Sequence, residues 1–443
     1  MDSGGAAALG VGDVRVAVTT LGCKVNQYDT AVMERLFAEK GWRRVAFGEL
    51  ADAYVVNTCT VTDRADSEAR RLARRARRAN PAGRVILTGC YAQTSPTEIA
   101  ELDYVDYVIG LGRLPALLQA VEGELVERVA VSDLRKADEV ATLGIETFPG
   151  RTRAFVKVQE GCNLFCTFCI VPVARGRSRS VPPRTVVEEV LRLEARGHRE
   201  IVLTGVHLGG YGDDLDPACD LSFLLEAIAE LAPRMRVRIS SIDPPEVTPR
   251  LVGMLASSPM LCPHLHVPLQ AGDDRVLERM GRRYTAAEAL AAFELLADRL
   301  PDVCIGTDVI AGFPGETDDE FERGLDFIAN AGFAYLHVFP YSQRSSTSAA
   351  KRWRPLPRAI VHERAARLRT LDRALRRVYE SRFMGRRVSV LFEDARDDAT
   401  GMLKGCTANY LHVVCDAEDR WRNRIADVEV TGKHGKRLRA RLL

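Results

Sequence analysis

One stretch of the chain decides the fold: Val158-Gln-Glu-Gly-Cys162-Asn-Leu-Phe-Cys166-Thr-Phe-Cys169-Ile-Val-Pro172. It overlaps the end of an apolar segment, Ala154–Gln159, which has the composition of a β-strand, so we expect the cysteines in the loop after that strand. Their spacing lets one short loop wrap three corners of a cubane iron–sulfur cluster, whose usual ligands are thiolates. A structural zinc site is the alternative, but it needs a fourth Cys or His, and none follows in this loop.

The chain after this loop repeats a strand–helix alternation. The first helix fits this pattern well, with Thr185 as its N-cap and Gly197 at its end. Six such units predict a partial (β/α)6 barrel rather than the full eight-fold one, with the cysteine loop at the catalytic end of the strands. The six predicted strands are Ala154–Gln159, Glu200–Thr204, Arg236–Ser240, His264–Val267, Val303–Val309 and Ala334–Phe339.

A second set of cysteines precedes the barrel. Cys23, Cys59 and Cys90 each follow an apolar run directly. Alternating strands and helices there predict a doubly wound parallel sheet, whose strand ends converge on one edge. The three thiols can therefore meet and hold a second four-iron cluster, although ordinary buried thiols remain the alternative. The predicted strands of this domain are Val14–Thr20, Ala53–Asn57, Arg84–Thr88 and Tyr104–Ile109.

The C-terminal part is basic and changes to a β pattern. Residues 351–387 carry 13 Lys or Arg against 3 Asp or Glu, and Ile360–Tyr379 reads as a helix. A charge block of this kind is typical of a polyanion-binding surface, or of a plain solvated helix face. Short strands then predict a small all-β, OB-like barrel. These strands are Arg387–Phe392, Gly405–Cys415, Asp427–Val430 and Leu438–Leu442.

Length and composition limit the number of domains and the class of protein. A chain of 443 residues with 46% hydrophobic and 28% charged residues suits two or three domains. No apolar run is long enough to predict a membrane helix, and residues 1–12 lack the basic region of a signal peptide, so we expect a cytoplasmic protein without a membrane partner. In that compartment the 11 cysteines favour metal chemistry over disulfides. The expected domains are residues 13–125, 148–378 and 380–443.

Together these features resemble the radical-SAM methylthiotransferase family, which joins a three-cysteine domain, a radical-SAM core and a TRAM module. The resemblance runs from about Val14 to Leu443. Asp243 departs from the pattern, because Glu is usual there, and so does Val173, where Tyr is frequent. Beyond the cysteine loop, the segments that carry the resemblance are Thr20–Gln27, Val56–Cys59, Leu203–Gly212, Arg238–Pro244, His264–Gly272, Met280–Tyr284, Asp308–Thr317 and Phe339–Ser342.

The resemblance implies two 4Fe-4S clusters and S-adenosyl-L-methionine (SAM), which acts as radical source and methyl donor. Cys162, Cys166 and Cys169 would hold the radical-SAM cluster, whose open iron binds SAM. Cys23, Cys59 and Cys90 would hold the second cluster, which carries the sulfur. The residues expected to contact SAM are Thr204, Gly205, Ser240, Ser241, Asp243, Gln270 and Asp308.

The implied reaction adds a methylthio group to C2 of N6-threonylcarbamoyladenosine beside the anticodon of tRNA. Isopentenyladenosine is the next candidate substrate, and a ribosomal-protein aspartate is a third. The resemblance also implies a one-electron donor such as flavodoxin or ferredoxin, and a sulfur source. Two other classes remain open: a non-catalytic, redox-sensing iron–sulfur RNA-binding protein, and a radical-SAM enzyme acting on peptides.

Several histidines and arginines fit either a functional or a structural role. Each of the histidines near predicted strand ends could touch substrate, but a structural role is favoured. Three arginines after the cysteine loop fit either phosphate contacts or surface ion pairs, and a row of arginines at helical spacing could hold RNA backbone or be a solvated face. The histidines are His207, His264, His266 and His337; the arginines are Arg175, Arg177 and Arg179, then Arg71, Arg74, Arg75 and Arg78.

Overall fold

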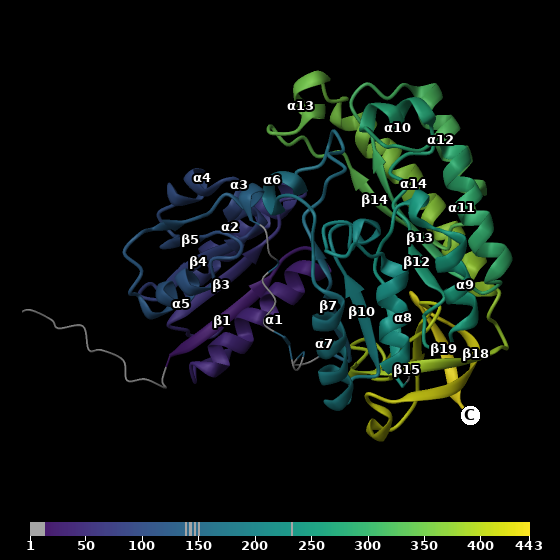
Figure 1. Ribbon diagram of the computed structural model, residues 1–443, viewed down its shortest axis with the longest axis horizontal. Coiled ribbons are helices and arrows are strands. Elements are labelled where there is room, and N and C mark those ends of the chain that lie inside the picture. Colours follow the sequence, from purple (N-terminus) through teal and green to yellow (C-terminus); the bar gives the residue numbers. More distant parts are fainter. Residues whose placement is uncertain (1–13, 138–139, 141–143, 146–147, 149–150, 232–233) are drawn as a thin grey trace, which may run out of the picture. The chain divides into compact units, whose positions relative to one another are not determined.

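The computed structural model of the chain (Figure 1) describes residues 14–443 except 138–139, 141–143, 146–147, 149–150 and 232–233. The chain divides into two compact units. The first runs to Ile145 and also takes up Ile170–Arg177, while the second comprises Glu146–Cys169 and Ser178–Leu443. The second unit therefore contains both the region of the expected barrel and that of the expected β module. The three expected domain boundaries stay predictions, and residues 1–13 lie outside the described part.

The first unit is built on a six-stranded parallel sheet in the order β2-β1-β3-β4-β5-β6. Its four predicted strands are confirmed, as β1 (Arg15–Thr20), β3 (Ala53–Thr58), β4 (Arg84–Gly89) and β5 (Tyr107–Ile109). The two edge strands were not predicted. They are β2 (Arg43–Val45) and β6 (Val129–Ala130), which are too short, and in β2 too exposed, to show an apolar run.

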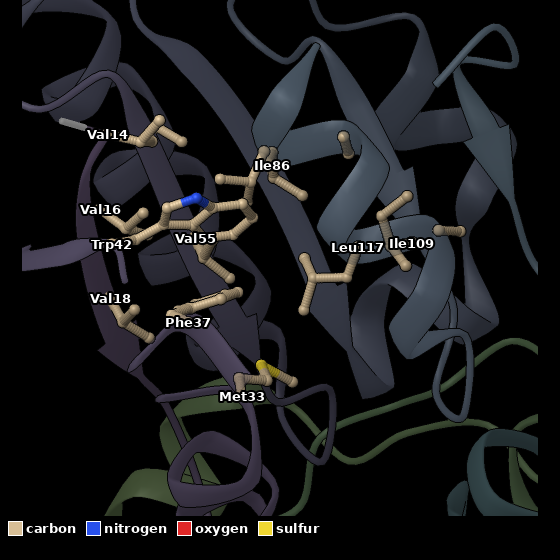
Figure 2. Close-up of a cluster of buried hydrophobic side chains, with 14 of the residues drawn as sticks. Val14, Val16, Val18, Met33, Phe37, Trp42, Val55, Ile86, Ile109 and Leu117 are labelled. Atoms are coloured by element: carbon tan, nitrogen blue, oxygen red, sulfur yellow. The ribbon is translucent and has the colours of Figure 1, made fainter. Parts of the chain in front are cut away.

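Helices cover both faces of this sheet. On one face, α1 (Lys24–Glu39) and α5 (Leu114–Glu122) pack on alternate strand residues such as Val16, Val55 and Ile86 (Figure 2). The opposite strand residues pack against α2 (Asp63–Ala79), α3 (Cys90–Thr94) and α4 (Pro96–Ala100). Because both faces of the sheet are covered, every residue of β3 is buried, and its first four, Ala53 to Val56, are apolar. The predicted doubly wound fold is confirmed.

The second unit contains the predicted partial barrel, as two three-stranded parallel sheets in the orders β11-β10-β7 and β12-β13-β14. The two sheets join where Val237 exchanges backbone hydrogen bonds with Met260 and Cys262. The six strands are β7 (Arg153–Lys157), β10 (Glu200–Thr204), β11 (Arg236–Ile239), β12 (His264–His266), β13 (Cys304–Ala311) and β14 (Tyr335–Pro340). The helices between them are α7 (Pro183–Ala195), α8 (Leu221–Leu231), α9 (Pro249–Ser257), α10 (Asp274–Met280), α11 (Ala286–Arg299) and α12 (Asp318–Asn330).

One predicted helix start is wrong. Helix α7 begins at Pro183, so Thr185 lies inside its first turn and does not cap it. Proline suits that first position because its missing N–H would have no partner there and its φ is already helical. The predicted end is right, since Gly197 follows the helix with a φ of 90°. None of the described helices has the length and hydropathy needed to cross a membrane.

The C-terminal residues form the predicted OB-like module, a closed barrel in the order β15-β16-β17-β19-β18. The predicted strand Gly405–Cys415 is wrong, because it is two strands joined by a tight turn in which Tyr410 has a φ of 67°. The strands are β15 (Arg387–Arg396), β16 (Leu403–Thr407), β17 (His412–Cys415), β18 (Ile425–His434) and β19 (Arg437–Leu442).

This module shares a core with the (β/α)6 barrel. Cys304 and Tyr335, at the starts of β13 and β14, pack in one apolar cluster with the interior of the module and with the end of α14 (Arg358–Ser381). Arg238 of β11 is almost fully buried, pairs with Glu200 at 2.8 Å and donates to the carbonyl oxygens of Thr407 and Ala408. Removal of the module would therefore uncover apolar surface and leave the buried Arg238 without its two carbonyl partners, Thr407 and Ala408.

Candidate active site

The cysteine loop lies at the carboxyl end of the first barrel strand, as predicted. Its conformation is fixed by contacts to the end of α10: Thr167 donates from its backbone N–H to Met280 and from its hydroxyl to Arg279. Within the loop, Cys169 N–H donates to the Cys166 carbonyl, and the backbone N–H of Leu164 donates to Cys162 Sγ at 3.4 Å. The three thiols are thus presented on one short loop and stay partly accessible.

The three thiols fit a cluster better than a single ion. Four ligands of one zinc ion lie roughly 3.8 Å from one another, as Zn–S bonds of about 2.3 Å in a tetrahedron require. Among the described residues, triplets of ligand atoms within 4.8 Å of one another occur at two places, and neither includes a cysteine. A four-iron cluster binds each thiolate to a different iron, so its ligands lie further apart. Three thiols on one short loop, outside the compact spacing of a single-ion site, are therefore candidate ligands of an iron–sulfur cluster.

Electrostatics at the loop also fit a bound cluster. Burial raises the pKa of the Cys162 thiol to about 11, so a bare thiol there stays protonated near neutral pH. Arg282 donates to Cys166 Sγ at 3.4 Å and pairs with Asp243 at 2.7 Å. A buried cation at hydrogen-bond distance from this sulfur suits an anionic group held by the loop. Arg282 was not predicted, although it lies within a segment, Met280–Tyr284, that follows the fourth strand.

Gln159 is a second residue that sequence reasoning missed. It is fully buried, and its amide nitrogen donates to the carbonyls of Glu160 and Gly161 and to the Ser178 hydroxyl. Its amide oxygen accepts from the backbone N–H groups of Val206 and His207. One side chain thus ties the entry of the cysteine loop to the loop after β10. In the sequence, the only sign of this role of Gln159 is a polar residue at the end of an apolar strand segment.

The predicted SAM contacts fall at the ends of neighbouring barrel strands. Thr204 ends β10 and is followed by Gly205, and Ser240 and Ser241 follow β11. Ser240 is buried, and its hydroxyl has no hydrogen-bond partner among the described residues. A buried hydroxyl without a partner is costly unless a ligand satisfies it. Within this set, Asp243 pairs with Arg282, and Arg282 in turn donates to Cys166 of the cysteine loop. Their contact with SAM stays a prediction.

The barrel interior holds a hydrogen-bonded trio. Asp308 of β13 accepts from His266 at 2.9 Å and from His337 at 3.2 Å. Burial opposes the shift, but these two hydrogen bonds lower the pKa of the Asp308 carboxyl far below its usual value. Gln270 joins this group through the backbone, because its N–H donates to the Asp308 carbonyl at 2.8 Å. Gln270, in the loop after β12, and Asp308 of β13 therefore lie side by side.

The other two predicted histidines differ in role. His264 begins β12, stacks on Tyr410 with ring centroids 4.2 Å apart and bonds the Tyr335 hydroxyl, so it is structural. His207 lies in the loop after β10. Burial opposes protonation there, but the Glu246 carboxylate beside it raises the pKa of His207. His207, Asp243 and Glu246 form one of the two compact triplets of ligand atoms noted above, the other being His266, Asp308 and His337.

The second cysteine set converges as predicted. Cys23 is the N-cap of α1, Cys59 follows β3 and Cys90 begins α3 after β4. The loops approach closely: a Cβ on Gly22, whose φ is 96°, would lie 2.9 Å from Cys59 Sγ, so only glycine fits there. Burial raises the pKa of the Cys90 thiol to about 12, and the charges of Cys23 and Cys59 act in the same direction. The three thiols therefore come from neighbouring strand ends at one edge of the sheet, where they are candidate ligands of one group.

Comparison with known proteins agrees with this architecture. The family model described as "Radical SAM superfamily" matches residues 156–328, and the one described as "Uncharacterized protein family UPF0004" matches residues 15–110. Among solved structures, the radical S-adenosylmethionine methyltransferase TsrM from Kitasatospora setae is similar over 76% of this chain and 77% of its own, with a TM-score of 0.56 and 16% identity. At that identity the likeness concerns the fold alone. The barrel and its cysteine loop define a radical-SAM enzyme, a class that implies SAM and one four-iron cluster.

Three curated relatives narrow the class. "Threonylcarbamoyladenosine tRNA methylthiotransferase MtaB" of Bacillus subtilis is 40% identical over 94% of this chain and 93% of its own length, and the protein of the same name in Aquifex aeolicus is 38% identical over 85% and 92%. "tRNA-2-methylthio-N(6)-dimethylallyladenosine synthase" of Jannaschia sp. is 34% identical over 97% and 94%. The chain belongs to the radical-SAM methylthiotransferase family.

Proposed function

We propose that this enzyme adds a methylthio group to threonylcarbamoyladenosine in tRNA, with two four-iron clusters in one chain. The observation that supports the substrate is the identity to relatives of each name: five with the threonylcarbamoyl name are 34–40% identical to this chain, and three with the dimethylallyl name are 32–36% identical. The second cluster is supported by the convergence of Cys23, Cys59 and Cys90 on one sheet edge.

The residues divide the work between the two sites. Cys162, Cys166 and Cys169 would hold the radical-SAM cluster, and the ends of β10 to β13 would hold SAM. When bound, these groups supply one-electron cleavage of SAM and hydrogen abstraction from the base, while the second cluster supplies sulfur that a further SAM methylates. Radical chemistry suits the task because an aromatic C–H is not acidic enough for any side chain near neutral pH. A one-electron donor such as flavodoxin or ferredoxin, a sulfur source and a cytoplasmic location stay predictions.

Nucleoside mass spectrometry tests the substrate. Deletion of the gene should remove 2-methylthio-N6-threonylcarbamoyladenosine from total tRNA and leave its unmodified precursor. A plasmid copy should restore the modification, and a matched copy with Cys162→Ala should not. Loss of the isopentenyl derivative instead would assign the enzyme to the runner-up substrate. Unchanged tRNA nucleosides would contradict an RNA substrate and favour the ribosomal-protein aspartate.

A basic pocket near the C-terminal module is suited to the tRNA backbone. The pocket has a volume of about 800 Å³ and lies between α14 and the module, where Lys436 also lines it. Arg369, Arg373 and Arg377 line it at positions i, i+4 and i+8 of α14, so one face of the helix presents three exposed cations in a row. Burial, and after it the charges of nearby arginines, lower the pKa of His412, another lining residue, to about 4. This local positive potential favours phosphate.

Neutralising that row should weaken tRNA binding. We expect the triple change Arg369→Gln, Arg373→Gln and Arg377→Gln to reduce affinity about 5- to 100-fold, as three exposed ionic contacts would. The logarithmic salt slope should flatten by about 2–3, because each phosphate contact contributes roughly 0.7–0.9. Filter binding at two salt concentrations measures both.

A control variant with equal loss of charge carries Arg71→Gln, Arg74→Gln and Arg78→Gln on the exposed face of α2. If the α2 variant weakens binding and the α14 variant does not, the tRNA surface lies on α2, and the assignment of the pocket is wrong. Point changes are preferable to truncation here, because the module shares its core with the barrel.

A further inference from the structure

Arg175 is a buried cation at the second cysteine site. Its side chain is 2% exposed, although the sequence favoured a surface ion pair or a phosphate contact. The surface reading is also wrong for Arg179, which is buried, and only Arg177 is exposed. Burying a guanidinium is expensive unless charged or polar partners surround it. The partners of Arg175 therefore indicate its role.

The backbone delivers Arg175 to this site in a fixed position. It is the last residue of α6 (Val171–Arg175), which packs through Ala174 on Cys90, Leu111 and Leu134. The next residue, Gly176, has a φ of 76°, and a Cβ there would lie 2.3 Å from the Leu134 carbonyl oxygen. Only glycine permits so close an approach, so the turn is anchored where it leaves the helix.

The polar partners connect Arg175 to the thiols. Its Nη2 donates to Asn26 Oδ1 at 2.5 Å and to Asp29 Oδ2 at 3.0 Å, and its side chain also hydrogen bonds Cys90. Asn26 is fully buried, and its amide nitrogen donates to the carbonyls of Leu21 and Thr58. Those two bonds fix the amide so that Oδ1 faces Arg175, with Cys90 Sγ 3.9 Å away.

The charge of Arg175 reaches more than one thiol. It lowers the pKa of Cys90 and of Cys59, against the burial that raises both. A four-iron core has too few positive charges to balance three thiolates, so the loaded site is anionic. It becomes more so when it is reduced or takes up an anionic sulfur ligand. Net charge and hydrogen bonds to sulfur are what set the potential of such clusters.

We propose that Arg175 is a positioning residue of the sulfur-donating site, which holds the excess negative charge of the second cluster and so raises its reduction potential. The inference rests on the proposed function, because that cluster is itself part of the proposal. Asp29 offsets part of the cationic charge, so Arg175 and Asp29 act in opposite directions on the same cluster. If Arg175 only supported the fold, replacing Arg175 and replacing Asp29 would not shift the reduction potential of the cluster in opposite directions.

A redox titration tests it. The full-length chain with Cys162→Ala, Cys166→Ala and Cys169→Ala leaves the second cluster alone, and electron paramagnetic resonance follows its reduction. In that background Arg175→Gln should lower the ratio of reduced to oxidised cluster at least about tenfold at a fixed potential, which is about 59 mV for one electron. Arg175→Lys should retain most of the wild-type ratio, and Asp29→Asn should raise it.

The outcomes separate the two proposals. If the triple variant binds no iron, the second cluster fails, and the proposed function with it. If it binds iron but Arg175→Gln and Asp29→Asn titrate like their parent, the role of Arg175 is overturned while the cluster stands. If Arg175→Gln does not hold iron, Asp29→Asn decides between the outcomes. An unchanged ratio of reduced to oxidised cluster in Asp29→Asn overturns the inference, and a raised ratio supports it.

Discussion

The enzyme in which Cys162, Cys166 and Cys169 are all alanine is expected to lose all SAM cleavage and about half of its iron. Anaerobic reconstitution of the wild type should give about eight irons per chain, four for each cluster. The variant should retain about four, because the other three thiols lie in a separate unit. Iron analysis and chromatographic detection of 5′-deoxyadenosine measure the two effects.

Cys219→Ala is the matched control for this loss. Cys219 is partly exposed, like the loop cysteines, but lies outside both predicted ligand sets. Its removal should leave iron content and deoxyadenosine formation unchanged. A triple variant that keeps all of its iron would show that the loop does not hold a cluster, and one that keeps half of its iron and still cleaves SAM would assign the radical chemistry to the other set.

Cys59→Ala is expected to have the second large effect, on one reaction only. It removes one thiol from the N-terminal site but leaves the barrel and its cysteine loop untouched, so SAM cleavage should continue while methylthiolated tRNA falls below detection. The substitution removes only the sulfur atom, and Cys59 follows β3 rather than lying within it, so the sheet should stay intact. Parallel assays of deoxyadenosine and of modified nucleoside give the comparison.

Normal methylthio product from Cys59→Ala would refute the sulfur-carrying role of this site. Loss of both activities would instead mean that the two sites depend on each other. Cys262→Ala serves as the control, since that thiol is buried to a similar degree and lies outside both ligand sets.

The sheets could be predicted because the buried parallel strands are largely apolar runs, and the set Cys23, Cys59 and Cys90 because each of its thiols follows such a run. The other set, Cys162, Cys166 and Cys169, could be predicted from its spacing within one loop. Sequence reasoning missed β2 and β6, whose few residues have no apolar run, and it joined β16 to β17 because the turn between them is itself partly apolar. A twist of the backbone at Tyr410, with positive φ, cannot be read from residue type.

The supporting side chains of the sites were hardest to predict. Arg282, Gln159 and Arg175 act through partners that are distant in sequence or bound through backbone atoms. An arginine that follows a loop is expected to face solvent from its residue type alone, and only tertiary packing reveals that Arg175 is enclosed. The candidate ligand cysteines could therefore be named from the sequence, whereas the side chains that surround and position them could not.

The assignment of Ile170–Arg177 to the first unit has a consequence for how the protein is made. A ribosome that has synthesised Ile145 has not yet supplied α6 or Arg175, and 32 further residues separate Ile145 from Arg177. At 5–20 residues per second this is a delay of about 2–6 s. The first unit therefore reaches its final form only after the cysteine loop of the second has been translated. The second unit waits longer, because its residues continue to Leu443. On the ribosome, the N-terminal unit is therefore complete before the barrel that follows it.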